Sequence, residues 1–430
     1  MNGSLKFVAP LVAALAIAAC NAGGQSNIPA SSGTTQIGAP ASASKLIRQY
    51  MEHRDPRFCP EVCLAIVPKK GAATPLCVAA ACGWTPSQLE TAYGLNSSLG
   101  NGTGTVVAVV EAGDDPDAAS TLAYYRSTFG LSAGTMYKYN EEGQQYNYPE
   151  SCEDYGWCLE TDLDIEMVSS ACPNCTIALM EANSYEAPDF EATEAEAVSI
   201  GATIISNSWS YEGSWDGSNY GGGTNFPTYF DTPGITYLAS SGDSGYGKIG
   251  APSVLDSVIA VGGTQLHLSG STYSQTIWND QYGAAGAGCS STGEVGSPGV
   301  PKPSWQHDPD CANRTDADVS AEAGLEPGVA VYTGIYGQWY EVGGTSVASP
   351  FTAGVIALAG NASSQNGGEN FWDLKKKKQK TELYVIKSGN DGSCSDPLTY
   401  LCAAGLKGKY KYRTYSGPGG WGTPLGIAAY

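Results

Sequence analysis

The sequence is poor in basic residues and in histidine. Its 430 residues include 22 lysines and arginines against 42 aspartates and glutamates, which gives a formal net charge of −20, and three histidines. Nucleic-acid binding needs clusters of basic side chains, so this balance argues against DNA or RNA as a partner. An acidic surface suits an extracellular protein, and its net charge shrinks as the medium turns acid, although solubility alone also explains it.

The sequence also lacks an apolar run of the ~20 residues that cross a membrane. The shorter run Phe7–Ala19 follows Lys6 and is typical of a signal peptide. Its end, Ile17-Ala18-Ala19-Cys20, resembles a bacterial lipobox with Cys20 as the lipidated first mature residue, and plain secretion is the alternative. We predict a signal peptide over residues 1–19 and an extracellular or cell-envelope location, with membrane contact only through a lipid on Cys20.

Cysteines are numerous by contrast. There are thirteen, and removing Cys20 leaves an even number, which in an exported chain predicts disulfides. Cys172-Pro-Asn-Cys175 would also suit a redox or metal pair, but no His or other Cys lies nearby in sequence. The close pairs are Cys152 with Cys158, Cys172 with Cys175, Cys289 with Cys311, and Cys394 with Cys402; Cys59, Cys63, Cys77 and Cys82 form an upstream group.

The chain divides into a short leader region and one large domain. Residues 21–44 are mostly Gly, Ala, Ser, Thr and Pro, as in a flexible tether. Residues 45–75 are too few for a core of their own. We therefore predict a tether and a short cysteine-bearing arm over residues 20–75 and the ordered domain over 76–430. Lys375–Lys378 is predicted to be a solvated loop.

Strand and helix patterns alternate through that domain. Apolar, β-branched strands between helices predict an α/β fold with a largely parallel central sheet and helices on both faces. The predicted strands are Thr105–Val110, Thr176–Met180, Thr203–Ser206, Ile235–Ala239 and Val258–Val261, and the predicted helices are Pro116–Phe129, one from about Glu160, and Phe190–Ile200.

A candidate nucleophile lies in the stretch Gly343-Gly-Thr-Ser346-Val-Ala-Ser-Pro350, which leads into the apolar run Phe351–Ala359. Ser346 would stand at a helix start, where free backbone N–H groups favour negative charge. A serine there could attack a carbonyl while its backbone helps to hold the oxyanion. An ordinary helix cap explains the same pattern, so a base is needed elsewhere.

Histidine is the usual base for such a serine. None of His53, His267 and His307 lies in the Gly-Thr-His helix start expected of a subtilisin base. We interpret all three as surface or packing residues. A Ser-His catalytic pair therefore has little support.

Carboxylates fit better. Glu160 and Asp164 are four residues apart, which places them on one helix face, where two like charges repel unless one holds a proton. Such a pair can serve as a base and its orienting partner. A solvated acidic helix face is the alternative, because Asp162 and Glu166 are adjacent. Asp243 follows a predicted strand among glycines, where it is either a site residue or a turn residue.

Taken together, these motifs resemble the sedolisin family of serine-carboxyl peptidases, which have a subtilisin-like fold. The resemblance covers the chain from about Leu76 to Tyr430. The motifs that carry it are Glu160-Thr-Asp-Leu-Asp164-Ile-Glu, Ser206-Asn-Ser-Trp209, Ala239-Ser-Ser-Gly-Asp243-Ser-Gly, Asp318-Val-Ser-Ala, Gly343-Gly-Thr-Ser346 with Pro350, and Gly420-Trp-Gly-Thr-Pro424.

The resemblance implies an exported serine-type endopeptidase that works through an acyl-enzyme. Ser346 would be the nucleophile, Glu160 its general base, and Asp164 the residue that orients Glu160. Asp243 would stand in the oxyanion hole, where it can donate a hydrogen bond only while protonated. A free aspartate ionises near pH ~4, so we predict an acid optimum.

Protein or peptide substrates are implied as well, bound extended by backbone pairing with two strand ends. The residues predicted to bind substrate are Ser206, Asn207, Ser208 and Trp209 on one strand end, and Ser240, Ser241 and Gly242 on the other.

Two departures from the family pattern stand out. The usual calcium site has two aspartates near the C-terminus, and Val385 and Ser416 stand in their places. We predict no cofactor and no calcium at that position, although Asp391 or Asp396 could supply a shifted site, and a Cys394–Cys402 disulfide could stabilise the region instead. The family's large prodomain is also missing, which suggests either no autoactivation or help from a separate factor.

Two other functions are compatible with the sequence. One is a His-dependent subtilisin-like protease. The other is a catalytically silent surface binding protein on the same scaffold.

Overall fold

A mostly parallel β-sheet forms the centre of the part of the chain that the structure describes. This computed structural model describes residues 63–68, 77–78, 81–212, 226–290, 299–374, 376–392, 399–405 and 414–430, all within one unit that spans Ala39–Tyr430. The predicted signal peptide and tether, together with Cys20, His53, Cys59 and Cys394, lie outside the described residues.

The sheet has eight strands in this part of the chain. Its order is β12 (Thr272–Ile277), β11 (Val258–Ser269), β8 (Thr236–Ser240), β6 (Ile204–Asn207), β3 (Val106–Ala112), β5 (Thr176–Ala182) and β4 (Met136–Asn140), with β15 (Val319–Glu322) also paired to β11. Every neighbouring pair is parallel except β11 with β12. Parallel strands end at one edge, so the loops that follow them meet there.

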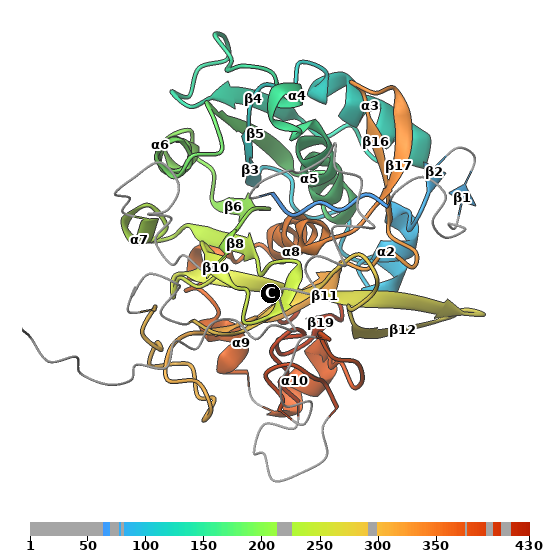
Figure 1. Ribbon diagram of the computed structural model, residues 1–430. Coiled ribbons are helices and arrows are strands. Elements are labelled where there is room, and N and C mark those ends of the chain that lie inside the picture. The colour runs from blue at the N-terminus through green and yellow to red at the C-terminus, as the bar shows by residue number, and fades with distance from the viewer. Residues whose placement is uncertain are drawn as a thin grey trace, which may run out of the picture. The chain divides into compact units, whose positions relative to one another are not determined.

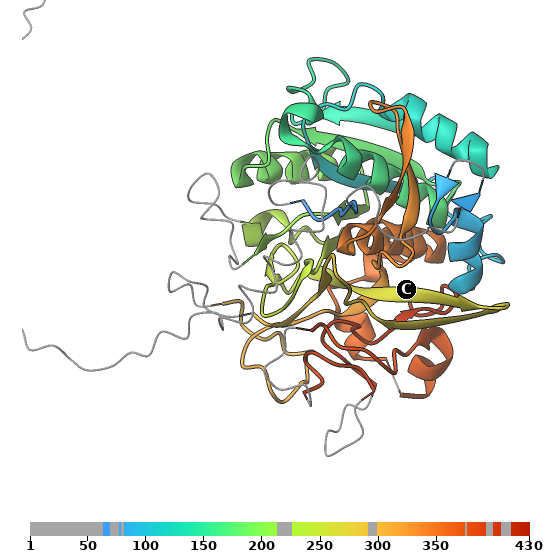
Figure 2. The same ribbon diagram turned by 45° about the vertical axis from the view of Figure 1, so that its right-hand side comes forward.

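Helices cover both faces of the sheet (Figure 1 and Figure 2). Alternate residues of β3 enter two different cores, with Val107 and Val109 in one and Ala108 and Val110 in the other. The first core packs beneath α2 (Pro86–Ala92), α3 (Ala118–Phe129), α5 (Cys158–Ala171) and α8 (Thr345–Ala359), and the second beneath α6 (Ala187–Ser199) and α7 (Phe226–Tyr229).

The predicted α/β fold with a largely parallel sheet is confirmed, and the sequence patterns missed the strands β4, β12 and β15 of this sheet. Residues Lys376–Glu382 form helix α10, so the prediction of a loop at Lys375–Lys378 is wrong for the described lysines, although Lys377 and Lys378 are exposed. No helix in the described ranges has the length and apolarity of a membrane-spanning segment. The remaining elements are β1 (Cys77–Val78), β2 (Ala81–Cys82), α4 (Cys152–Tyr155), β7 (Tyr211–Glu212), β9 (Ser244–Tyr246), β10 (Gly250–Ala251), β13 (Ala284–Cys289), β14 (Thr315–Asp316), β16 (Val329–Thr333), β17 (Gln338–Val342), η1 (Ala362–Ser364), α9 (Glu369–Trp372), β18 (Leu383–Tyr384) and β19 (Thr423–Pro424).

Helix α5 is held at both ends by disulfides. Cys152–Cys158 joins α4 to its first residue, and Cys172–Cys175 follows its last turn. Cys289–Cys311 closes a third bridge, and Cys63, Cys82 and Cys402 are also disulfide-bonded. All 14 residues of α5 are buried, including four acids, so only tight packing on every side can hold this helix in place.

A buried ion pair lies beside β11 and β15. Arg314 donates from both terminal nitrogens to Asp318, at 3.1 and 2.6 Å. Asp318 also accepts the indole N–H of Trp372 at 2.8 Å and the backbone N–H of Ala260 at 2.9 Å. The carboxylate of Asp318 is therefore satisfied by four donors, two of which belong to the positively charged guanidinium of Arg314.

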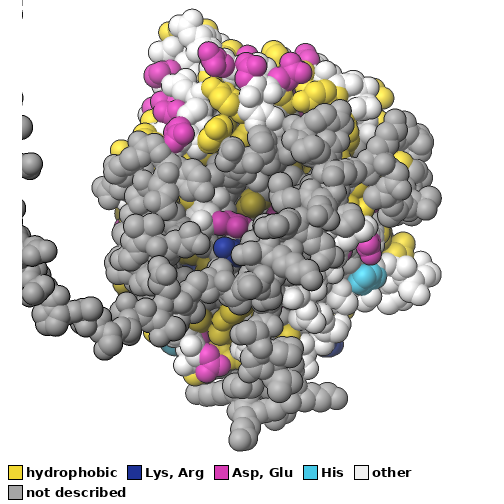
Figure 3. All heavy atoms as spheres, viewed as in Figure 1, with side chains coloured by type: hydrophobic (Ala, Val, Ile, Leu, Met, Phe, Trp, Pro, Cys, Tyr) yellow, Lys and Arg dark blue, Asp and Glu magenta, His cyan; other side chains and the backbone are white. Residues whose placement is uncertain are grey.

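Exposed acids gather over α4 and the loop that follows β4 (Figure 3). They include Glu142, Glu150, Glu153 and Asp154. This face carries part of the net negative charge of the chain.

Candidate active site

Four predicted residues come together where α5, α8 and β8 meet. Ser346 is the second residue of α8, Glu160 and Asp164 lie one turn apart on α5, and Asp243 follows β8. All four are buried. The interpretation of α5 as a solvated acidic face is therefore wrong.

Ser208 connects two of them, Asp164 and Ser346. Its hydroxyl lies 2.8 and 2.9 Å from the two carboxylate oxygens of Asp164, and its carbonyl accepts the Ser346 hydroxyl at 3.3 Å. The Ser208 hydroxyl also lies 3.4 Å from the Ser346 carbonyl. That carbonyl needs an outside partner, because Pro350 lacks the N–H that would bond to it within α8.

A row of buried carboxylates leads away from Ser346. Burial raises the pKa of Glu160 well above its usual value, the charge of Asp164 raises it further, and hydrogen bonds with Ser346 and Ala65 oppose the rise. Burial raises the pKa of Asp164 to about 8, against hydrogen bonds with Ser208 and Glu111. Carboxyl groups that lie close to one another and away from water share protons instead of all ionising.

Glu111 extends that row and was missed by the sequence reasoning. It lies in β3 and is fully buried, and burial raises its pKa well above normal, as do the charges of Asp164 and Glu160. A signal was present, because a glutamate interrupts the apolar strand Val106–Ala112. A buried charged residue without a cation is rarely structural alone.

Asp243 is fixed at the start of α8. Its Oδ1 accepts the backbone N–H of Thr345 at 2.8 Å and the Thr345 hydroxyl at 2.9 Å. Gly344 has a φ of 106°, and a side chain there would meet Asp243 Oδ2 at 2.8 Å. Only glycine therefore leaves room at this position for a group to approach Asp243.

The segment Cys63–Pro68 lies in this site, although the sequence placed it outside the ordered domain. Leu64 N donates to Ser208 O at 3.2 Å, and Ile66 and Gly343 exchange two backbone hydrogen bonds of 2.9 and 3.0 Å. In Figure 1 the blue segment passes between α5 and α8. The boundary predicted at residue 76 leaves out this part of the site.

The predicted substrate-binding residues divide into two groups. Ser208 and Trp209 pair through their backbone with the segment, Ser208 with Leu64 and Trp209 with Cys63. Ser206 and Asn207 use their side chains internally instead. The Ser206 hydroxyl bonds with that of Ser349 at 2.9 Å, and the Asn207 amide donates to Leu238 O at 3.2 Å.

The second predicted strand end, Ser240–Gly242, is buried. Ser241 N donates to Val261 O at 3.0 Å, and Gly286 N donates to Gly242 O at 2.7 Å. The segment's other backbone partner is Gly343, which sequence reasoning quoted only as part of the serine motif.

The two described histidines lie away from Ser346. His267 is exposed in β11, where its Nε2 lies 3.0 Å from the Thr276 hydroxyl, and His307 is exposed in a loop. Ser346 is fully buried. His53 is outside the described residues.

The stretches that replace the family's calcium aspartates contribute no carboxylate at Val385 or Ser416, and Ser416 is buried in a turn that pairs with Gly420. Among the described residues, no three His, Cys, Asp or Glu side chains are grouped to hold a metal ion. Asp391 is buried and Asp396 is not among the described residues.

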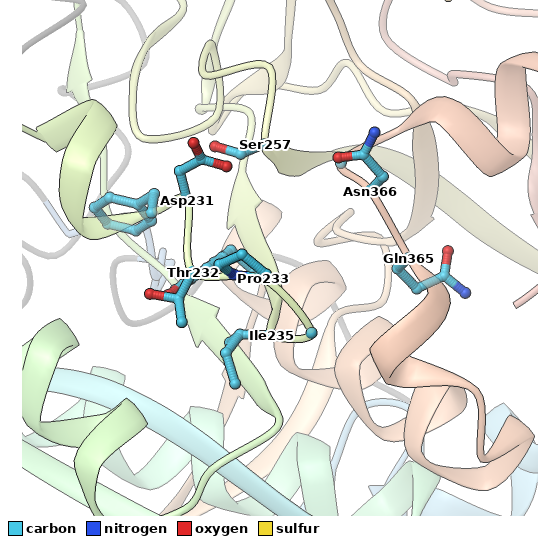
Figure 4. A pocket seen from close by; sticks show the side chains of 11 residues that line it. Asp231, Thr232, Pro233, Ile235, Ser257, Gln365 and Asn366 are labelled. Atoms are coloured by element: carbon cyan, nitrogen blue, oxygen red, sulfur yellow. The ribbon is translucent and has the colours of Figure 1, made fainter.

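A separate pocket lies at the opposite end of β8 (Figure 4). Asp231 to Ile235, which precede β8, form one side of it, and Gln365 to Gly367 form the other. The candidate nucleophile and carboxylates lie at the carboxyl end of the same strand. This pocket is therefore not part of the candidate active site.

Comparisons with known proteins agree with this geometry. The chain matches the subtilase family over residues 132–375. It is 26% identical over 393 residues to sedolisin of Pseudomonas sp. (strain 101), covering 83% of this chain and 62% of that protein. It is 30% identical over 164 residues to xanthomonalisin of Xanthomonas sp. (strain T-22), covering 35% of this chain and 20% of that protein. The chain thus spans less than two thirds of the length of either curated relative.

A solved structure has a similar fold. It is Pseudomonas sedolisin, described as a serine-carboxyl proteinase complexed with two molecules of pseudo-iodotyrostatin. The match has a TM-score of 0.62 and 24% identity, and covers 80% of this chain and 96% of that one.

Proposed function

This chain belongs to the subtilase family, and from that premise we propose that it is a serine-carboxyl endopeptidase that cleaves peptide bonds through an acyl-enzyme at acid pH. One observation supports this most. The group beside Ser346 is the carboxyl of Glu160, in a place where a serine nucleophile needs a base.

The reaction follows from the arrangement. Ser346 Oγ attacks the scissile carbonyl carbon while Glu160 takes the hydroxyl proton. Glu160 then gives that proton to the leaving amine, and the carbon–nitrogen bond breaks. Water enters, gives its proton to Glu160 and hydrolyses the ester, and Ser346 recovers its proton.

Asp164 and Glu111 support Glu160 without touching substrate. A carboxyl that gains and loses a proton in a dry site needs neighbours that adjust to each state. Asp164, with a pKa of about 8, can hold a proton toward Glu160 when that group is ionised. Glu111 does the same for Asp164.

Asp243 supplies the oxyanion donor in this proposal. Its Oδ1 is occupied by Thr345, and its Oδ2 faces the space over Gly344. A protonated Oδ2 can donate to an oxyanion, whereas an ionised one repels it. Activity should therefore fall as this carboxyl ionises, which supports an acid optimum.

Export is the second part of the proposal. The three described disulfides are of the kind that persist in oxidising compartments. The apolar run Phe7–Ala19 would direct export, and Cys20 would carry a lipid. We include the absence of calcium at Val385 and Ser416, since neither residue offers an anionic oxygen.

The experiment is a casein digest from about pH 2 to about pH 8, which brackets ordinary carboxylate titration near 4. Wild type is compared with Ser346→Ala, Glu160→Gln and the matched control Glu166→Gln. Glu166 is also a buried glutamate of α5, but its Oε2 accepts Tyr332 N at 3.1 Å in β16. Wild type and Glu166→Gln should digest casein best in acid, and the other two should not.

The remaining functions give different results. Full activity of Glu160→Gln, with a peak at or above neutral pH, would favour a His-dependent protease. Absence of digestion by every variant at every pH would favour a binding protein on this scaffold.

A further inference from the structure

Positive charge is concentrated toward the carboxyl end of the sequence. Residues 71–372 contain 35 acidic and 5 basic residues, whereas residues 373–430 contain ten basic residues and four acidic ones. Five of the six residues 375–380 are lysines. A chain with a net charge of −20 thus carries one strongly basic stretch, which the proposed peptidase chemistry does not use.

Helix α10 presents part of this charge to solvent. It spans Lys376–Glu382, and lysine is a good helix former. At about 100° per residue, Gln379 points nearly opposite to Lys377. Gln379 is 2% exposed, so it marks the inner side of the helix. The outer side carries three exposed lysines, called here the α10 lysines, which are Lys377, Lys378 and Lys380.

Acidic neighbours neutralise little of this surface. Lys378 lies 3.7 Å from Glu382, and its side chain is 64% exposed, so the two form a weak surface pair. The nearest acid before the helix in sequence is Asp373, which is exposed as well. No ion pair of Lys377 or Lys380 is found within the described part of the chain. The α10 lysines therefore keep most of their positive charge for an outside partner.

The composition of α10 favours an anionic membrane surface as that partner. The helix contains Lys, Gln, Thr and Glu, without an aromatic ring or an arginine. Single-stranded nucleic acids stack their bases on aromatic rings, and arginine is the residue that binds phosphate in a fixed, bidentate geometry. Protein interfaces are depleted in lysine. Lysines on the outer side of one helix instead match anionic lipid head groups, which attract such clusters without a shaped site.

The acidic remainder of the domain does not prevent this attraction. In Figure 1, α10 lies at the lower end of the molecule and α4, near the exposed acids, lies at the upper end, and Figure 2 agrees. A domain of this length is roughly 50 Å across. Salt at about 0.1 M screens charges beyond ~10 Å. A membrane beside α10 therefore senses the lysines and not the acids around α4.

We propose that the α10 lysines hold the protein against a membrane that contains anionic lipids. The sequence assigned membrane contact to a lipid on Cys20 alone. Such a lipid would attach the domain through the predicted flexible tether and leave it free to turn. The α10 lysines fix its orientation, with α10 toward the head groups and the acids around α4 away from them. This surface does not depend on peptidase activity.

The test measures sedimentation of the full chain with lipid vesicles. All chains carry Cys20→Ser, which removes the proposed lipid, and Ser346→Ala, which prevents digestion. The vesicles contain phosphatidylcholine alone or with about 30% phosphatidylglycerol, which supplies the anionic head groups. Binding to phosphatidylcholine alone measures attachment through the apolar run Phe7–Ala19 and is subtracted. The parent chain should bind the anionic vesicles in about 0.05 M NaCl and leave them in about 1 M NaCl, where charges are screened within ~3 Å.

The triple variant Lys377→Gln, Lys378→Gln and Lys380→Gln removes the surface. Each lysine near an anionic membrane strengthens binding by about 5-fold, so this variant should bind about 100-fold more weakly than its parent. All three side chains are exposed, so the two melting temperatures should agree, which controls for folding. Equal binding by the two chains, binding that high salt leaves unchanged, or no binding by the parent would overturn the proposal.

A second variant separates the position of the charge from its amount. It adds Glu142→Gln, Glu153→Gln and Asp154→Asn, on the acidic face of Figure 3, to the triple lysine variant, which returns the net charge to −20. Binding should stay about 100-fold weaker than that of the parent. Recovery of binding would mean that net charge alone decides, and would overturn the α10 surface.

A single-stranded oligonucleotide tests the other class of polyanion. The parent chain should bind it no more tightly than the triple lysine variant does. An oligonucleotide that binds the parent more tightly than the anionic vesicles, and loses that affinity in the triple variant, would assign the α10 lysines to nucleic acid. That result would overturn the membrane as their partner.

Discussion

Two clusters of buried carboxylates reduce the free-energy cost of burying a negative charge in opposite ways. Around Ser346, Glu160, Asp164 and Glu111 lie together, and burial raises the pKa of all three. Beside β11 and β15, Asp318 is paired with Arg314. Burial disfavours the ionised form of the carboxyls in both clusters. The carboxyls of the first cluster compensate by binding protons, and Asp318 compensates by pairing with Arg314.

The difference shows how to tell a working acid from a structural one. A carboxylate that is hydrogen-bonded to a buried arginine, as Asp318 is to Arg314, has a fixed structural partner. Burial raises the pKa of the three carboxyls beside Ser346, and raised pKa values are typical of groups that exchange protons, as a base must. Substitutions in the first cluster should therefore lower activity, and substitutions in the second should lower stability.

The largest expected effect is on activity in the first cluster. Asp164→Asn keeps the shape of the side chain but cannot share a proton with Glu160, so kcat should fall roughly 10³- to 10⁴-fold. Its melting temperature should equal that of wild type or exceed it, because the amide removes a buried acid. Asp318→Asn is the matched control and should keep most of its kcat. Comparable losses of kcat in both variants would contradict the distinction between catalytic and structural carboxyls.

The next effect is on stability in the second cluster. Arg314→Met leaves Asp318 buried without its cation, which should lower the free energy of unfolding by about 4 kcal/mol. Urea unfolding of the Ser346→Ala form, with and without Arg314→Met, measures it. Replacing both partners, as Arg314→Met with Asp318→Leu, should recover part of the loss. A loss below about 1 kcal/mol would mean that the pair is not structural.

The pH dependence of stability should follow the buried carboxyls with raised pKa values, of which Asp164 belongs to the first cluster. A carboxyl with a folded pKa above its unfolded value of ~4 stabilises the fold below that value, and the contribution disappears as the pH rises through the folded pKa. Burial raises the pKa of Asp115 to about 6, of Asp316 to about 7 and of Asp164 to about 8. Stability should therefore be greatest near pH ~4 and decline toward pH ~8.

Calorimetry of the Ser346→Ala form checks this, and its melting temperature should be at least ~5 °C lower at the higher pH. Adding the substitution Asp164→Asn should make the decline in melting temperature smaller, because residue 164 then no longer titrates. A melting temperature that rises between these two pH values would contradict the proton-sharing account of the site.

Calcium should have the smallest effect. With Val385 and Ser416 in place of acids, adding about 10 mM calcium after EDTA treatment should move the melting temperature by less than ~2 °C. The double variant Val385→Asp with Ser416→Asp tests whether these positions are the ones that matter. A large shift in wild type would point to another site, with Asp391 as the first described candidate.

Sequence patterns located the parts of the site that lie within single elements. Helical spacing predicted Glu160 and Asp164, and the glycines and the apolar run around Ser346 predicted the nucleophile. The strands of the sheet show themselves by β-branched apolar residues. Each of these signals lies within a short stretch of sequence, so it can be recognised without knowledge of the fold.

The features that were missed depend on contacts between distant segments. Glu111 becomes part of the site only because β3 places it beside α5. Leu64 and Ala65 reach Glu160 across about 95 positions of sequence. A short arm with too little core of its own looked like a tether, because nothing in its composition reveals that it is bound by the rest of the chain.

The contacts of residues 63–68 also bear on how a peptide would reach the site. A segment tethered beside the groups that it contacts has an effective concentration of about millimolar or more, however dilute the protein is. A competing peptide would have to match that local concentration before it could take the place of the segment.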